Sequence, residues 1–123
     1  HVDILITSKK FAFNYTNYHN IDQAMDQLQQ SFPKVIVTLG EEGAKYYLEG
    51  KRGSLSADKV KVVNTNGAGD IFHGAFIAGL AAGLDLIECS KLAGRIASWH
   101  CTQESVEFSL KKLGSSLSLQ SFL

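Results

Sequence analysis

The segment from Asn64 to Asp70 restricts the fold of this chain more than any other feature, and it spells Asn-Thr-Asn-Gly-Ala-Gly-Asp. It follows a β-branched run, Val60-Lys61-Val62-Val63, and precedes a long apolar segment with helical spacing, Ile71–Leu84. Glycine lets the backbone come close to a ligand, and a helix N-terminus presents unpaired N–H groups with a partial positive charge. The segment therefore predicts a strand, a turn and a helix, with an anion site at the turn.

The composition is that of one globular domain, with 123 residues, 45% hydrophobic and 20% charged. The formal net charge is zero, which gives no electrostatic reason to expect a nucleic acid or a membrane as partner. No stretch reaches the ~18 apolar residues of a membrane span, and no signal peptide is visible. The chain starts at His1 inside an expected strand, so we expect that the N-terminal part of a longer protein is missing.

The two cysteines, Cys89 and Cys101, fall within one helical pattern. Their separation along a continuous helix is about 18 Å, too far for a disulfide. A pair without a CxxC motif is also no zinc site, so we expect no bound structural metal. Free thiols are typical of a reducing compartment, and we expect a cytoplasmic protein.

Apolar periodicity predicts the secondary structure. We expect strands at Val2–Thr7, Lys34–Leu39, Ala44–Leu48, near Ser54–Leu55 and at Lys59–Val63. We expect helices at Ile21–Phe32, at Ile71–Leu84, from Leu86 to about Thr102, and in the tail at Phe108–Leu113 and Leu117–Leu123. The segment Ser8–Asn20, rich in Asn, is expected to be irregular. This order predicts an α/β fold with a mostly parallel sheet, one β-hairpin and helices on the faces, including the helix after Asp70.

The thirteen residues Asn64–Phe76, NTNGAGDIFHGAF, resemble the C-terminal signature of the ribokinase-like (PfkB) carbohydrate kinase family. The resemblance implies a ribokinase-like Rossmann-type layered fold. It also implies that Asp70 is the general base, taking the proton from the acceptor hydroxyl. The N–H groups of Gly67, Ala68 and Gly69 would then form the anion hole for the transferred phosphoryl group, and fixed dipoles of this kind are often the largest catalytic term.

The segment has two other interpretations. Without the resemblance, it is a tight strand-to-helix connection with Asp70 as a first-turn partner of the helix dipole. A dinucleotide-binding fingerprint does not fit, because the third glycine is Gly74, not two residues beyond Gly69, and a second helix follows.

Two further segments resemble the nucleotide side of the same family. The segment Thr38–Ala44, TLGEEGA, resembles its nucleotide-side strand and turn, with Thr38, Gly40 and Gly43 at the ATP phosphates and ribose. By itself it is typical of a hairpin turn. The helix Leu92–Thr102 resembles the one that packs under adenine. The residues expected to flank the base are Ala97, Cys101 and Ser105, although a packed helix also explains the pattern. Trp99 and His100 are expected to be partly exposed and not to bind a ligand.

Some positions depart from the family pattern. Asn64 stands where the family usually has an Asp that helps hold a monovalent cation; Asn keeps an oxygen but loses the charge, which argues against activation by potassium. Asn64 and Thr65 remain candidates on the nucleotide side. Ser8-Lys9 stands where many members have Asn-x-x-Glu for magnesium. Three short strings are similar to the ketohexokinase branch of the family: Ser8-Lys9, Glu41–Ala44 and Ile71–Phe76. His73 is expected to be a helix-surface residue without a role.

The resemblance implies that residues 1–123 are the C-terminal nucleotide-binding and catalytic portion of a PfkB-type kinase, lacking the N-terminal half and the lid. The intact enzyme would phosphorylate a hydroxyl of a small sugar or related alcohol with ATP and Mg²⁺, and the fragment alone would be inactive. Two alternatives stay open: a non-catalytic or truncated module of the same fold, and a nucleoside kinase of the adenosine type. Homodimer formation is also left open.

Overall fold

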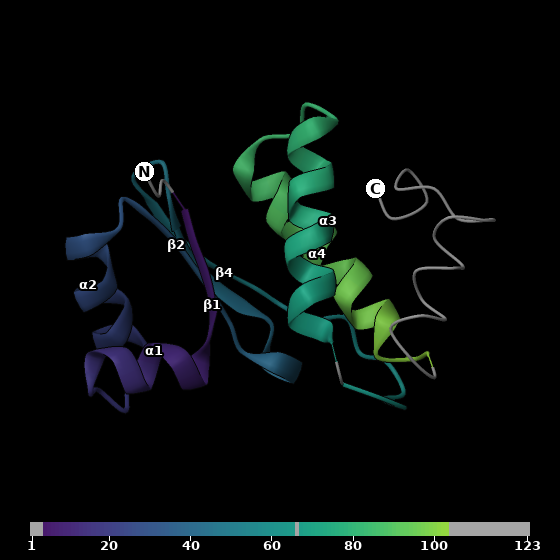
Figure 1. The fold of residues 1–123 in the computed structure, drawn as a ribbon, viewed down its shortest axis with the longest axis horizontal. Helices are drawn as coiled ribbons and strands as arrows, with labels where there is room; N and C mark the ends of the chain where they lie inside the picture. The colour runs from purple at the N-terminus through teal and green to yellow at the C-terminus, as the bar shows by residue number, and fades with distance from the viewer. Residues whose placement is uncertain (1–3, 66, 104–123) are drawn as a thin grey trace. The chain divides into compact units, whose positions relative to one another are not determined.

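The structure, a computed structural model, describes residues 4–65 and 67–103. The chain divides into two compact units, His1–Ser56 and Ala57–Leu123, and each is described by itself (Figure 1). The predicted tail helices at 108–113 and 117–123 lie outside the described residues, as does Ser105. Within the described ranges, every helix is too short or too polar to span a bilayer.

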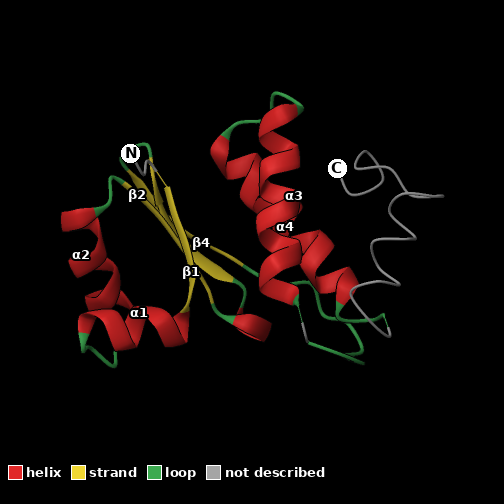
Figure 2. Cartoon of the chain, viewed as in Figure 1, coloured by secondary structure: helices red, strands yellow, loops and turns green. Residues whose placement is uncertain are grey.

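The first unit is built on a four-stranded sheet (Figure 2). Its strands, in both chain and spatial order, are β1 (Ile4–Ser8), β2 (Lys34–Thr38), β3 (Ala44–Leu48) and β4 (Lys51–Leu55). The β1–β2 pair is parallel, whereas the β2–β3 and β3–β4 pairs are antiparallel. The described sheet is therefore mixed and not mostly parallel. The physical reason is the pair of tight turns before and after β3, each of which can only return the chain antiparallel.

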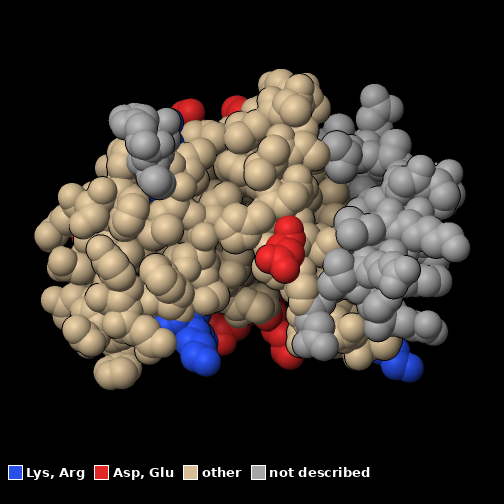
Figure 3. Space-filling model, viewed as in Figure 1, with Lys and Arg blue, Asp and Glu red and all other residues tan. Residues whose placement is uncertain are grey.

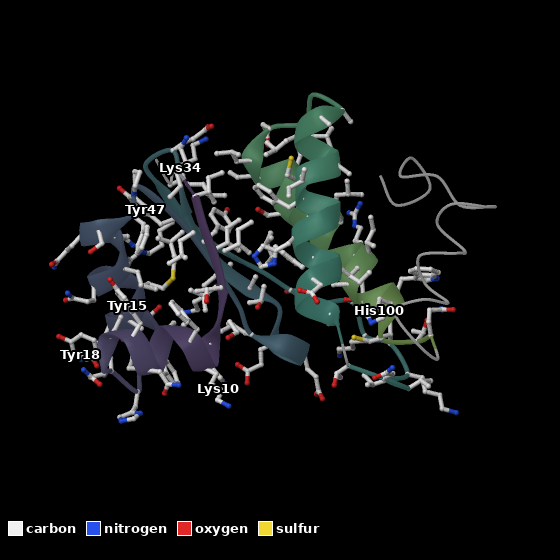
Figure 4. All side chains as sticks on the ribbon, in the orientation of Figure 1. Lys10, Tyr15, Tyr18, Lys34, Tyr47 and His100 are labelled. Atoms are coloured by element: carbon white, nitrogen blue, oxygen red, sulfur yellow. The ribbon has the colours of Figure 1, made fainter. Side chains whose placement is uncertain are left out.

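Two helices, α1 (Lys9–Thr16) and α2 (Ile21–Ser31), cover one face of this sheet (Figure 1). Tyr47 points from β3 toward the same side (Figure 4). The prediction of α2 is confirmed, and its start is set by Asn20, whose side-chain oxygen accepts from the N–H groups of Asp22 and Gln23 at 3.0 and 3.1 Å. The core between helices and sheet consists of Ala12, Ala24, Met25, Leu28, Val35 and Val37.

The helix α1 was not predicted, because Ser8–Asn20 was expected to be irregular. Ser8 is its N-cap and accepts from the N–H of Phe11 at 3.2 Å. Asn17 ends it in the left-handed region at φ 62°, a conformation that Asn tolerates. Only Ala12 is buried along the helix, so no apolar stripe marks it in the sequence.

Ion pairs join α2 to the β-hairpin on the exposed side of the first unit. Asp22 binds Lys45 of β3 at 2.8 Å, and Asp26 binds Arg52 of β4. The hydrogen bond and charge of Lys45 lower the pKa of Asp22 below its ordinary value. Because both partners are largely exposed, we assign these pairs to orienting the helix and not to a large share of the stability.

The second unit is a pair of packed helices, α3 (Ala68–Ala81) and α4 (Leu86–His100) (Figure 2). Both helices were predicted, although α3 begins before Ile71. Asp85 caps α4, accepting from the N–H of Glu88 at 2.8 Å. The buried apolar residues of the two helices are Ile71, Phe72, Ala75, Phe76, Cys89, Leu92, Ala93 and Ile96.

The expected strand at Lys59–Val63 is wrong within the part of the chain that the structure describes. Its β-branched residues favour an extended chain, but no described strand pairs with it, and a strand needs a partner to bond its backbone. Val63 donates its N–H instead to the carbonyl of Cys101, at 2.7 Å. The packing of α3 on the sheet stays a prediction, because α3 belongs to the other unit.

A close contact between α3 and α4 lies at Gly79 and yields a stability prediction. A Cβ at Gly79 would lie 3.0 Å from Cys89 Sγ and 3.4 Å from Leu92 Cδ2, whereas one at Gly94 of α4 meets nothing within 4 Å. Gly79→Ala and Gly94→Ala gain the same helix propensity, so their difference isolates the crowding. In urea unfolding, we expect Gly79→Ala to be less stable than Gly94→Ala by about 1 to 3 kcal/mol, which is the usual cost of overpacking. Equal stabilities would contradict the close packing.

Candidate functional site

The turn before α3 is held by Gly67, which is the N-cap of that helix at φ 77° and ψ 4°. A side chain in this left-handed conformation costs about 1 to 2 kcal/mol, so the backbone requires glycine here. The carbonyl of Gly67 accepts from the N–H of Ile71 at 2.9 Å, and the N–H of Ala68 reaches the carbonyl of Thr65 at 3.3 Å. No side chain caps this N-terminus within the described residues. Apart from the N–H of Ala68, which bonds to Thr65, the first N–H groups of the helix have no side-chain partner among the described residues, and a ligand or water can take them up.

Asp70 and Gly69 lie in the first turn of α3, and both are exposed. A carboxylate at this end of a helix interacts favourably with the helix dipole. A Cβ at Gly69 would meet nothing within 4 Å, and the residue has no left-handed φ that would require glycine. The second unit itself therefore gives no steric reason for glycine at position 69, whereas a ligand that approaches the backbone would give one.

The C-terminal end of α4 holds the loop that leads into this turn. The carbonyl of Cys101 accepts two N–H groups, from Val63 at 2.7 Å and from Asn64 at 3.0 Å. Such a carbonyl at a helix end has no partner within its helix, so the loop satisfies it. Cys101 itself donates its N–H to Ala97 at 3.1 Å. The structure thus brings together three of the predicted nucleotide-site residues: Asn64, Ala97 and Cys101.

Both cysteines are free thiols, as the sequence predicted. Burial raises the pKa of the Cys101 thiol, so it stays largely protonated at neutral pH. Burial, with the nearby charges of Asp85 and Glu88, also raises the pKa of Cys89. The Cys89 side chain lies inside the α3–α4 contact, whereas Cys101 is only half-buried.

His100 corrects one expectation at this end of α4. It was expected to be partly exposed, but its side chain is fully buried near the C-terminal end of the helix (Figure 4). Helical spacing alone does not predict this burial, because it arises from tertiary packing; the loop at Val63 and Asn64 bonds to the neighbouring Cys101. Trp99 is half-buried, as expected.

The remaining nucleotide-site candidates belong to the first unit. Thr38 ends β2 and donates its hydroxyl to the carbonyl of Thr7 on β1 at 3.3 Å. Gly40 begins the 3₁₀ turn η1 (Gly40–Glu42) at φ 62°, and Gly43 follows it at φ 93°, so both need glycine for the turn itself. Leu39 and Gly43 close the turn with a bond of 2.8 Å. The convergence of these residues with the Gly67 turn stays a prediction, because the two lie in different units.

His73 makes a contact that the sequence analysis did not anticipate. It is exposed, as expected of a surface residue, but its Nδ1 lies 2.8 Å from the carbonyl oxygen of Gly69, one turn earlier in α3. The i, i+4 spacing could have indicated this contact, since side chains in a helix lean toward its N-terminus.

Charged side chains are few on the face of the molecule drawn in Figure 3. On the face drawn in Figure 3, neither unit gathers Lys and Arg into a continuous basic patch. No group of three or more His, Cys, Asp or Glu residues in the described ranges could hold a metal ion. The strongest electrostatic feature of the candidate site is therefore the uncapped N-terminus of α3 at Gly67.

Comparison with known proteins gives a family and close relatives. The family described as pfkB family carbohydrate kinase matches residues 1–113. The uncharacterized sugar kinase YegV of Escherichia coli K12 is 42% identical over 74 residues, which cover 59% of this chain and 23% of that protein. Ribokinase of Lactococcus lactis is 38% identical over 71 residues, 57% of this chain and 24% of that protein. The chain thus matches about a quarter of the length of these relatives.

Solved structures of related kinases are similar in fold to this chain. Arabidopsis thaliana ribokinase, complexed with ribose and ATP, is 28% identical with a TM-score of 0.78, covering 88% of this chain and 37% of that one. Adenosine kinase of Sinorhizobium meliloti is also 28% identical, with a TM-score of 0.76, covering 94% of this chain and 37% of that one. These likenesses confirm the predicted ribokinase-like α/β fold.

The two glycines of the turn are predicted to differ in what they do for stability. Gly67→Ala places a side chain at φ 77° and should lower the free energy of unfolding by about 1 to 2 kcal/mol. Gly69→Ala meets open space in a helix and should raise it by about 0.5 to 1 kcal/mol. Urea unfolding of both variants checks this, and a destabilised Gly69→Ala would show that glycine at 69 serves packing.

Proposed function

Because the chain belongs to the pfkB family of carbohydrate kinases, we propose that residues 1–123 form the C-terminal nucleotide-binding and catalytic portion of a kinase. The intact enzyme transfers the γ-phosphoryl group of ATP to a hydroxyl of a small sugar or related alcohol. The observation that carries this proposal is the Gly67 turn, an uncapped helix N-terminus with Asp70 exposed in the first turn. The relatives named sugar kinase and ribokinase support the substrate class.

The proposed reaction uses this turn as an anion hole. Asp70 accepts the proton of the acceptor hydroxyl while that oxygen bonds to the γ-phosphorus. The bond from this phosphorus to the bridging oxygen of ADP breaks, and ADP leaves with the electron pair. Meanwhile the N–H groups of Gly67, Ala68 and Gly69 donate to the oxygens of the transferred group, where negative charge must be stabilised. The N–H of Ala68 does so once bound nucleotide displaces its hydrogen bond to the Thr65 carbonyl. Fixed backbone dipoles do this without reorganising during the step.

The residues proposed to contact the nucleotide come from both units. Asn64, Thr65, Ala97 and Cys101 supply contacts from the second unit, and Ser105 is proposed beside the base although it lies outside the described residues. The residues proposed at the phosphates and ribose from the first unit are Thr38, Gly40 and Gly43.

Magnesium fits this chain as an ion carried by the nucleotide. Kinase sites hold Mg²⁺ with substrate phosphates and one or two carboxylates, not with an all-protein cage. The described residues are consistent with that arrangement, since they form no cluster of three metal-binding side chains. The ion would neutralise phosphate charge when bound. Asp70 would still accept the proton of the acceptor hydroxyl, and the Gly67 turn would still form the anion hole.

A nucleoside kinase is the second candidate function. The likeness to Sinorhizobium meliloti adenosine kinase favours it, because its identity equals that of the ribokinase structure. A panel of sugars and nucleosides tested on the full-length protein separates the two, and turnover of neither class would favour a non-catalytic module. Cytoplasmic location, homodimer formation and the ketohexokinase-like branch remain proposals.

Asp70→Asn is predicted to remove the general base while keeping the size and hydrogen bonding of the side chain. We expect kcat of the full-length enzyme to fall by about 10²- to 10⁴-fold, the usual contribution of general-base catalysis, while the KM for ATP changes little. Steady-state kinetics with the preferred acceptor measures both values. Asp58→Asn is the matched control, because Asp58 is an exposed acid of the same unit outside the site. Near-wild-type kcat in Asp70→Asn, with chemistry limiting, would remove Asp70 from the mechanism.

Bound nucleotide is predicted to protect Cys101 from alkylation. Because burial raises its pKa, labelling by N-ethylmaleimide should be slow at pH 7 and faster as the pH rises toward 9. Saturating MgADP should then slow labelling at Cys101, as read from peptide masses. Cys89, buried in the α3–α4 contact, is the internal control for a general gain in stability. Unchanged labelling of Cys101 under saturating nucleotide would place the adenine elsewhere.

A further inference from the structure

The first turn of α3 is weakly held by its own sequence. Its N-cap, Gly67, offers no capping side chain, and glycines occupy positions 69 and 74 within the first two turns. Each glycine in a helix interior costs about 1 kcal/mol relative to alanine. A capping Ser or Asp, which would offset this, would also occupy the N–H groups that an anion needs. An anion hole of this kind therefore needs support that leaves its N–H groups free.

His73 supplies such support from the second turn. Its Nδ1 lies 2.8 Å from the carbonyl oxygen of Gly69. A carbonyl only accepts, so Nδ1 must carry the proton and donate it, which fixes the imidazole tautomer. The same carbonyl also accepts the helical N–H four residues later, and its two lone pairs allow both bonds.

The bond acts on the peptide unit that joins Gly69 to Asp70. The carbonyl of Gly69 and the N–H of Asp70 belong to one rigid plane, so holding the carbonyl also fixes the amide beside the general base. Hydrogen bonds in such a chain polarise one another, which strengthens the N–H as a donor. The imidazole thus stabilises the turn from the side opposite to its free donors.

We propose that His73 is a positioning residue for phosphoryl transfer, holding the Gly69–Asp70 peptide in the helical geometry that the anion hole requires. This inference rests on the proposed function. His73 touches neither the phosphoryl group nor the acceptor in this role, and its effect passes through the backbone of Gly69. The contribution is realised when charge develops in the transition state, so it belongs in kcat and not in KM.

The test compares variants of the full-length enzyme at position 73. His73→Phe keeps a ring but removes the donor, and His73→Asn keeps an N–H near the place of Nδ1. Ile77→Phe, one turn further along α3 and exposed, is the matched control for an added aromatic ring. For each variant we would measure kcat, both KM values, the melting temperature, and hydrogen exchange of the Ile71 amide, which bonds to Gly67.

The expected result is a fall in kcat of about two- to tenfold for His73→Phe, the range that corresponds to one hydrogen bond. Exchange of the Ile71 amide should accelerate by a similar factor, because both report opening of the first turn. KM values should stay within about twofold in this case, and His73→Asn should recover most of kcat. Ile77→Phe should match the parent, and ¹⁵N NMR should show the Nδ1–H tautomer at His73.

Several outcomes would overturn the inference. An unchanged kcat in His73→Phe, unchanged exchange at Ile71, or failure of His73→Asn to recover activity would each show that the peptide is held without His73. If the parent enzyme phosphorylates no sugar or nucleoside, the proposed function fails and this inference fails with it. If the parent enzyme is active and His73→Phe has the same kcat, only the inference about His73 is overturned and the proposed function stands.

Discussion

The arrangement of the second unit depends on the hydrogen bonds that the carbonyl of Cys101 accepts. This carbonyl accepts two N–H groups from the loop at Val63 and Asn64, and so ties the end of α4 to the segment that enters the Gly67 turn. These bonds hold the loop in place of strand pairing, since residues 59–63 pair with no described strand. The same contact places Cys101, which follows the buried His100, beside Asn64. The loop that enters the turn is thus held by the end of a helix, at Cys101, which lies 37 residues after Asn64 in the chain.

The glycines of the turn show how one motif combines structural and functional requirements. Gly67 is required by its left-handed backbone, whatever the turn binds. Gly69 has open space around its Cβ position and a conformation that any residue could adopt, so the described residues give no steric reason for glycine there. Glycine lowers the stability of the first helical turn, whose N–H groups are the proposed donors. The proposed role of the hydrogen bond from His73 to the Gly69 carbonyl is to offset part of that loss.

Local signals in the sequence predicted the elements whose ends they mark. Asn20 and Asp85 are residues of the kind that cap helices and do so here, and the apolar spacing of α2, α3 and α4 is visible because each buries one face. The same reasoning missed α1, since its single buried residue leaves no stripe and its cap, Ser8, follows directly on a strand. It overpredicted the strand at 59–63, because β-branched residues favour an extended chain but cannot provide a partner.

The sequence by itself determined the local chemistry of this protein: the small-residue turn, the acid after it, the free thiols and the family. These follow from residue type and short spacing, which act within a few residues along the chain. The tertiary structure alone decided which distant groups meet, as when the Cys101 carbonyl takes up the loop at Val63 and the sheet becomes mixed through its hairpin. The physical reason is that backbone N–H and C=O groups are the same at every residue. Their long-range pairing therefore leaves no mark in the sequence and is fixed only when the folded chain brings them together.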